Sequence, residues 1–246
     1  MQLILRRKQK LSSFIALCVV VAVVLVCVRL GYWQLARAEQ KQQQLTAIAN
    51  MQTQGVMSWQ QLQAMPSKWN KTGVVVELVG KIINQQYWLL DNQVYQGQVG
   101  YDLLVLFKPS QASDALLVNL GWVKAPISRS ELPNIQLPKR NITFKAQIKE
   151  RNLTSFNLQT NATKQDLQKR IQSIDLQKLS EQSNQSLFNF MAYRQGAGDA
   201  LAIPHYKAVV MSPQKHQAYA VQWFLIALAC VVVAIFASKK RTNNEK

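Results

Sequence analysis

Two long apolar runs lie at opposite ends of this 246-residue chain, and they constrain its fold more than any other feature. They cover residues 11–30 and 218–237. A helix of about 20 residues rises about 30 Å, which is the thickness of the hydrocarbon core of a bilayer. The sequence therefore predicts a membrane protein with one transmembrane helix at residues 11–31 and a second at residues 217–237.

Basic residues flank both runs on the sides that face the ends of the chain. They are Arg6, Arg7, Lys8 and Lys10 at the N-terminus, and Lys239, Lys240, Arg241 and Lys246 at the C-terminus. Because Lys and Arg near a span resist translocation, both tips, residues 1–10 and 238–246, are predicted to be cytoplasmic. Residues 32–216 then form an extracytoplasmic domain, and we expect a two-pass protein of the inner (cytoplasmic) membrane of a bacterium, with this domain in the periplasm.

A cleaved signal peptide is the alternative interpretation of the N-terminus. Ala36, Arg37 and Ala38 resemble a cleavage site between small residues. However, the apolar run is longer than a typical signal core, and Tyr32 and Trp33 lie between the run and that site. These features favour a first helix that is retained in the mature protein.

The chain is strongly basic, with 29 Lys and Arg against 12 Asp and Glu and a formal net charge of +17. The extracytoplasmic residues share this excess, which suits an anionic lipid surface, a haem propionate or an acidic partner protein. A solvated basic surface is the simpler alternative, because the charges are scattered. Nucleic acid is not an expected partner of a domain that faces away from the cytoplasm.

The three cysteines, Cys18, Cys27 and Cys230, all lie within the apolar runs. The domain between the runs therefore has neither a disulfide nor a cysteine metal site available to it. It must be stabilised by an apolar core, and at its length it can bury one.

Residues 32–52 lack Gly and Pro, so the first helix should continue beyond the apolar run as a polar stalk. Ser58 then begins a short capped helix that ends before Pro66. β-branched and aromatic runs separated by turn residues follow, and an amphipathic pattern at 164–182 predicts a helix that covers one face. The predicted strands are 74–83, 86–90, 101–107, 115–123 and 141–149, with 188–194 and 206–211 as further candidates.

These elements predict an α+β domain of mainly antiparallel β structure, as a meander or a barrel with one covering helix, enclosed between two transmembrane helices. No catalytic motif is evident. Residues 212–215 match a Ser-x-x-Lys pattern, but Ser212 before Pro213 is also the ordinary start of a helix. We therefore expect a protein that is not an enzyme.

This helix start places His216 in the first turn of the second span. A neutral imidazole at a membrane boundary can coordinate iron. Helical spacing aligns His216 with Tyr219 and Trp223, while Gln222 lies slightly to the side. The alternative is an interfacial belt, in which His, Tyr and Trp only anchor the helix at headgroup level.

A second stripe lies at the outer end of the first span. Arg29, Trp33 and Arg37 repeat every four residues, so guanidinium groups can approach the Trp33 ring from both sides. An Arg just inside an apolar run is costly unless it meets an anion, such as a propionate or a lipid phosphate, or snorkels to the headgroups.

Four segments in order resemble motifs of one family. The segment Gly31 to Arg37 with Lys41, and the segment His216 to Phe224, are similar to motifs of the Surfeit-locus family (first member) of cytochrome c oxidase assembly proteins. The segments Gly97 to Tyr101 and Leu117 to Val123 resemble its two middle motifs, although Leu120 stands where the family usually has Arg.

The resemblance implies an assembly factor for the haem-copper oxidase, respiratory complex IV, that binds haem a transiently and aids its insertion into subunit one. His216 would be the axial ligand, Trp33 and Trp223 would flank the macrocycle, and Arg37 or Arg29 would meet the propionates. We expect Trp33, His216 and Trp223 to converge in a cleft between the outer ends of the two spans.

The partners that the resemblance implies are oxidase subunit one, haem a synthase and copper chaperones, besides the membrane lipids. The alternative function is a cofactor-free membrane scaffold that holds oxidase subunits or a copper-delivery partner.

Overall fold

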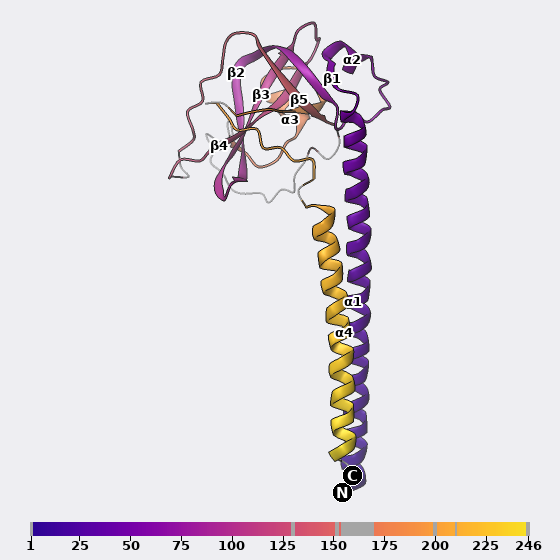
Figure 1. The fold of residues 1–246 in the computed structure, drawn as a ribbon. Coiled ribbons are helices and arrows are strands. Elements are labelled where there is room, and N and C mark those ends of the chain that lie inside the picture. The colour runs from indigo at the N-terminus through magenta and orange to yellow at the C-terminus, as the bar shows by residue number, and fades with distance from the viewer. Residues whose placement is uncertain are drawn as a thin grey trace. The chain divides into compact units, whose positions relative to one another are not determined.

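The computed structural model describes residues 2–128, 131–150, 153, 170–198, 201–209 and 211–244. The chain divides into two compact units (Figure 1). Met1–Thr46 and Val209–Lys246 form the helical unit, and Ala47–Ala208 form the barrel unit.

The helical unit is built from α1 (Gln2–Gln52) and α4 (Pro213–Asn244). Within them, Phe14–Gln52 and Pro213–Ser238 are long and apolar enough to cross a membrane. Many of their large apolar side chains are exposed, among them Leu25 and Phe236. Such a surface is stable in lipid but not in water, and both helices therefore fit a two-pass membrane protein. α1 continues without a break through residues 32–52, as predicted.

The barrel unit contains the remaining elements. In chain order they are β1 (Val56–Ser58), α2 (Trp59–Ala64), β2 (Val75–Tyr95), β3 (Gln98–Pro109), β4 (Ala115–Lys124), β5 (Ile142–Lys149), β6 (Arg170–Ile171), α3 (Leu176–Ser183) and β7 (Leu187–Arg194). The predicted short helix at Ser58 is confirmed as α2, where Ser58 and Gln61 form a capping box.

Five strands close into a barrel, which confirms the predicted fold class. β2 pairs with β3, β3 with β4, β4 with β7, β7 with β5, and β5 again with β2. Of these five ladders, the one between β4 and β7 is parallel and the others are antiparallel. β2 takes part twice, because residues 75–80 pair with β5 and residues 80–95 pair with β3. Closure leaves these strands with few unpaired edges.

Side chains alternate between two apolar clusters, one on each face of the curved sheet. The first cluster, which we call the interior cluster, includes Leu78, Phe107 and Val118. The second includes Trp88 and Leu104 and lies beneath α3. The Trp88 indole also donates a hydrogen bond to Gln182 of the α3 segment at 3.3 Å. α3 is thus the predicted covering helix.

Two of the predicted strands, 74–83 and 86–90, belong to one strand, β2. The polar residues between them do not form a turn. The pairing with β3 instead shifts register between Ile82 and Tyr87, where Gln85 has a φ of 48°. This irregularity is a bulge, and β2 pairs with β3 on both sides of it.

The helix predicted at 164–182 is wrong over residues 170–175. Arg170 and Ile171 form β6, which pairs with β2, and the helix begins only after its N-cap residue Asp175, whose carboxylate accepts the amide of Lys178. Residues 164–169 lie outside the described residues. The strand predicted at 188–194 is confirmed as β7.

The strand predicted at 206–211 is wrong, since residues 206–209 and 211 are not strand and residue 210 lies outside the described residues. The backbone instead pairs with the barrel a few residues earlier in the chain. Ile203 makes an isolated antiparallel bridge to Trp122, with backbone hydrogen bonds of 2.7 and 2.9 Å. Side-chain contacts hold the residues that follow, as described below.

Candidate functional site

Small residues bring α1 and α4 into close contact within the helical unit (Figure 1). On α1, Gly31 lies against the ring of Phe224, and a Cβ atom at Gly31 would come within 2.5 Å of that ring. The Phe224 ring also meets Tyr32 edge-on, with ring centroids 5.5 Å apart. On α4, Ala220 and Ala227 are buried. Close approach through small residues is the usual way in which membrane helices associate.

A polar contact joins the same two helices at the first turn of α4. His216 Nδ1 lies 2.7 Å from Gln34 Oε1, and His216 is only 8% exposed. The predicted helix start is confirmed, because α4 begins at Pro213 and the Ser212 hydroxyl accepts the amide of Lys215. This start fixes His216 in the first turn, on the side of α4 that faces α1.

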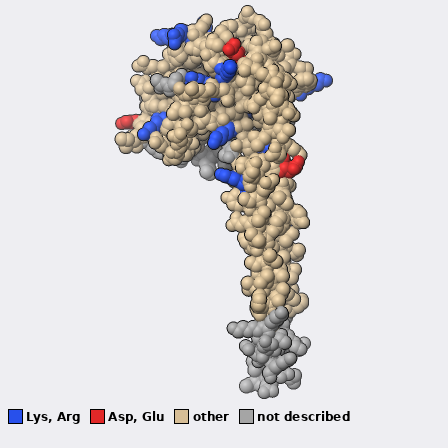
Figure 2. Space-filling view, viewed as in Figure 1, with Lys and Arg blue, Asp and Glu red and all other residues tan. Residues whose placement is uncertain are grey.

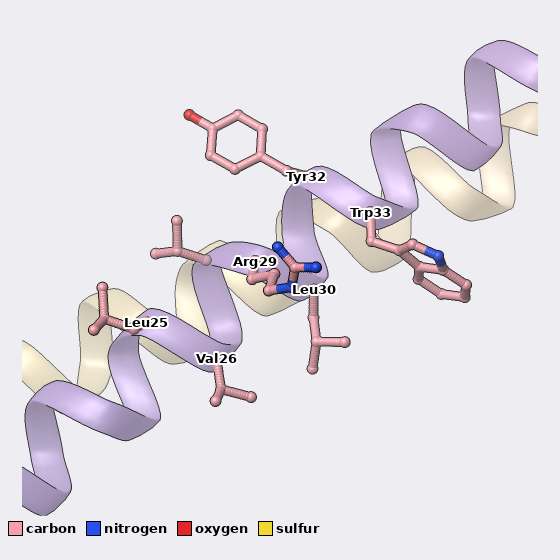
Figure 3. A pocket seen from close by; sticks show the side chains of 7 residues that line it. Leu25, Val26, Arg29, Leu30, Tyr32 and Trp33 are labelled. Atoms are coloured by element: carbon pink, nitrogen blue, oxygen red, sulfur yellow. The ribbon is translucent and has the colours of Figure 1, made fainter.

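The predicted residues of α1 lie elsewhere. Arg29, Trp33 and Arg37 are exposed, and Arg29 and Trp33 line an open groove on α1 (Figure 3). At 100° per residue, this groove lies on the opposite side of α1 from Gly31 and Gln34. Arg37 does approach Trp33, with its guanidinium carbon 5.9 Å from the ring centroid. The structure therefore does not bring Trp33 beside His216 in one cleft.

The predicted residues of α4 are also divided. Trp223 is half-buried at the flank of the helix contact, Tyr219 is 45% exposed, and Gln222 is exposed on the side away from α1. Of the predicted site residues, His216 has a hydrogen-bond partner on the other helix. This partner is Gln34, which was not among the predicted site residues. The signal was available, because Gln34 directly follows Trp33 in the first motif.

The contact between His216 and Gln34 defines the chemistry of this site. An amide oxygen only accepts hydrogen bonds, so Nδ1 of the ring carries the proton and donates it. When a ring with its proton on Nδ1 is neutral, its lone pair is on Nε2, which is the nitrogen that a metal can take. A haem iron needs only one such nitrogen from the chain, so His216 and Gln34 fit a haem. Among the described residues there is no cluster of three or more His, Cys, Asp or Glu that suits a metal ion.

A second polar centre lies in the barrel unit and was not predicted. Asp102 of β3 and Asn119 of β4 are buried, and the Asn119 amide donates to Asp102 Oδ2 at 2.6 Å. The other carboxylate oxygen, Oδ1, lies 2.5 Å from His205 Nε2. Asn119 Oδ1 in turn accepts the amide of Gly121 at 2.8 Å. Both oxygens of the buried carboxylate thus have partners, as a buried charge requires.

This centre fastens residues 201–206, which we call the return strap, to the outside of the barrel. His205 and the Ile203 bridge hold it, and the Tyr206 ring stacks on Tyr193 of β7 at a centroid distance of 3.7 Å. Gly121 has a φ of 127°, and a Cβ atom there would collide with the carbonyl of Ile203. Glycine is therefore needed for the strap to approach.

Burial shifts the pKa values of three titratable groups in or beside the strap. It raises the pKa of the Tyr193 phenol, and the neighbouring Tyr206 and Asp102 raise it further. Burial also raises the pKa of Tyr206 and lowers the pKa of Lys149, whose ammonium lies 5.7 Å from the Tyr193 ring centroid. These shifts follow from loss of solvent around the charged forms.

The two middle motifs now have a structural explanation. Asn119, Gly121 and Trp122 hold the strap, and Gly100 leaves room for the Trp122 ring. Leu120, at the position where Arg is usual, is 2% exposed in the interior cluster. His205 could have been noticed as one of only two histidines, but nothing in the sequence pairs it with Asp102.

The sequence matches a known protein family. A sequence model of the SURF1 family matches residues 21–228, which include residues 21–52 of α1, residues 213–228 of α4 and the whole barrel unit. Among curated proteins, none matches the chain significantly.

Proposed function

Because the chain belongs to the SURF1 family of cytochrome c oxidase assembly proteins, we propose that it holds haem a transiently and aids its transfer to oxidase subunit one. The role in oxidase assembly follows from the family. The cofactor and its recipient are our proposal, as are the inner membrane of a bacterium and a periplasmic barrel unit. Cytoplasmic tips are favoured by the basic residues at both ends of the chain.

The observation that carries the proposal is the hydrogen bond between His216 and Gln34. With the proton on Nδ1, Nε2 of a neutral ring can act as an electron-pair donor in the first turn of α4. When bound, haem a would supply an iron that accepts this one nitrogen. His216 would supply the donor nitrogen, and its hydrogen bond to Gln34 would set the tautomer.

Transient binding suits this arrangement. A carrier that hands on its haem must not bind it too tightly, and a single imidazole provides one coordinate bond. No second imidazole lies within reach of this one among the described residues, since His205 belongs to the barrel unit.

A second candidate function is a scaffold without cofactor, and one observation favours it. Arg29 and Trp33 line a groove on the side of α1 away from His216, where they are open to a transmembrane helix of a client subunit (Figure 3). In this function the hydrogen bond of His216 only stabilises the helix pair. On the face in Figure 2 the Lys and Arg side chains are scattered and do not gather into one patch.

The two functions are separated by absorption spectra of the full chain, purified in detergent from a strain that synthesises haem a. We expect a haem a spectrum in the wild type that is lost in His216→Ala. The matched control is His205→Ala, since these are the two histidines of the chain. A colourless wild type that co-purifies with the oxidase would support the scaffold, and equal spectra in both variants would rule out His216 as the ligand.

A further inference from the structure

An open groove with a volume of about 760 Å³ lies on one side of α1 (Figure 3). The described residues that line it are aliphatic or aromatic, apart from Arg29. Leu25 and Val26 lie about one turn before Arg29, and Tyr32 and Trp33 lie about one turn after it. The aliphatic part of the groove thus belongs to the apolar run, and its aromatic part lies where that run ends, as is usual at the level of lipid headgroups.

The charge of Arg29 is not balanced within the helical unit. Its side chain is exposed, and no described residue forms a hydrogen bond or an ion pair with it. Residues 1–38 and 209–244, which include both apolar runs, contain no Asp or Glu. Glu39, the first acidic residue of α1, accepts a hydrogen bond from Gln43 at 3.0 Å. Because an Arg in a membrane span is costly without an anion, a ligand that brings one is stabilised at this site.

We infer that this groove binds an anionic phospholipid, such as phosphatidylglycerol, with its phosphate on Arg29 and an acyl chain along Leu25 and Val26. A guanidinium group binds phosphate through charge-assisted, often bidentate hydrogen bonds. Tyr32 and Trp33 would flank the headgroup, since each ring has an apolar body and a polar tip. The lipid therefore matches the groove in charge and in the order of its polar and apolar parts.

Other occupants match the groove less well. A zwitterionic phospholipid carries an ammonium group that cancels the charge of its phosphate, so the charge of Arg29 would remain unbalanced. A client transmembrane helix, the occupant in the scaffold function, would have to place an Asp or Glu within its own apolar span. A phospholipid avoids this cost, because its phosphate already lies at the edge of the apolar layer.

The inferred lipid site is separate from the contact between the two helices. The groove lies on the opposite side of α1 from Gly31 and Gln34. A lipid bound there leaves the packing of Gly31 on Phe224 and the hydrogen bond of His216 intact. The inference requires that α1 lies in a membrane but does not depend on haem binding, so the two proposals can fail separately.

Photolabelling of the full chain in phosphatidylcholine nanodiscs tests the inference. The two probes, a phosphatidylglycerol and a phosphatidylcholine, have identical acyl chains that carry a diazirine, and mass spectrometry locates the labelled residues. We expect phosphatidylglycerol to label residues 25–33 about fivefold more than phosphatidylcholine does, the ratio that corresponds to about 1 kcal/mol for one cation near anionic lipid. The exposed apolar residues of α4, such as Leu225 and Val233, are the internal control and should be labelled equally by both probes.

Two exposed arginines of α1 provide matched variants. Arg29→Gln should abolish the preference at residues 25–33, whereas Arg37→Gln, the same charge change outside the groove, should leave it unchanged. Arg37 has partners of its own, the side-chain oxygen of Gln40 at 2.9 Å and the Trp33 ring. Equal labelling of the groove by the two probes in the wild type, which no folding defect can explain, would overturn the inference and leave the groove to a client helix. A preference that persists in Arg29→Gln would overturn it as well.

Discussion

Each of the two units contains one of the two histidines of this chain. The two imidazoles form their hydrogen bonds through different ring nitrogens. In the helical unit, Nδ1 of His216 meets the neutral amide of Gln34. In the barrel unit, Nε2 of His205 meets the buried carboxylate of Asp102. A carboxylate can pair with a protonated ring, so His205 suits a structural fastening. The amide oxygen of Gln34 accepts from Nδ1, so a neutral His216 ring would carry its lone pair on Nε2, which suits a ligand.

The two units also differ in how they are held together. The barrel unit buries large apolar side chains completely, such as Trp88, Phe107 and Leu104. In the helical unit the contact between the helices is made by small residues, among them Gly31 and Ala220, while many large apolar side chains are exposed. The barrel therefore has a stable core of its own, and the geometry of the proposed haem site depends on a few contacts.

Removal of a barrel core side chain should have the largest effect. Phe107 is fully buried and packs edge-on against Phe144, with ring centroids 5.2 Å apart. Phe107→Ala should lower the free energy of unfolding of the barrel by about 3–5 kcal/mol, measured by denaturant titration of the full chain in detergent. Val79→Ala, at a residue that is 43% exposed, is the control and should change it by less than about 1 kcal/mol. Similar costs for both would contradict the assigned core.

Loosening the return strap should have a smaller effect. Gly121→Ala introduces a Cβ atom that collides with Ile203, at a φ of 127°, and should cost about 2–3 kcal/mol. Gly97→Ala also has a positive φ, 77°, but open space around the Cβ atom, so it should cost about 1 kcal/mol. Hydrogen exchange at the amides of Trp122 and Ile203 should accelerate in the first variant only. Unchanged exchange there would argue against a fastened strap.

The buried tyrosines at the strap predict that the free energy of unfolding of the barrel unit decreases at alkaline pH. The pKa of Tyr193 is higher in the folded state than its ordinary value of 10.0, so above about pH 10 the unfolded chain loses a proton that the folded chain keeps. The stabilisation is complete below that pH and is lost as pH rises, by up to about 1.4 kcal/mol per pH unit. Tyr193→Phe should reduce this slope in denaturant titrations above pH 10. An unchanged slope would show that the pKa of Tyr193 is not raised in the folded state.

The sequence predicts the helical unit better than its site. Apolar runs of about 20 residues and the Ser212-Pro213 start fix both helices, because these signals are local. The position of Trp33 relative to His216 depends on which faces of α1 and α4 meet, and Gly31 decides this through its contact with a residue far away in sequence. Spacing along one helix cannot reveal that contact.

The barrel shows the same division. Strands with strong β-branched and aromatic content, such as 115–123, are predicted nearly to their ends. The pairing of Asp102 with His205 joins residues 103 positions apart, and no local pattern indicates it. The strap is missed for the same reason, because it is held by a bridge and by side chains rather than by a strand of its own.

Loss of the interhelical hydrogen bond should have the smallest effect on stability. Gln34→Leu should weaken association of α1 with α4 by about 0.6 kcal/mol, the typical value for such bonds in membranes, measured by detergent titration of the full chain. The control is Gln42→Leu, at an exposed residue of the same helix. If the two substitutions have equal effects, the bond to His216 does not stabilise the helix pair.

The tautomers of the two imidazoles test the central claim most directly, by NMR of the full chain labelled with ¹⁵N in histidine. We predict a neutral His216 ring with its proton on Nδ1, and a His205 ring with a proton on Nε2. Gln34→Leu should alter the signals of His216 alone, and Asp102→Asn should alter those of His205 alone. A His216 ring with its proton on Nε2 would contradict the account, because Nε2 would then have no lone pair for a metal. Unchanged His216 signals in Gln34→Leu would also contradict it, because Gln34 would then not determine the tautomer.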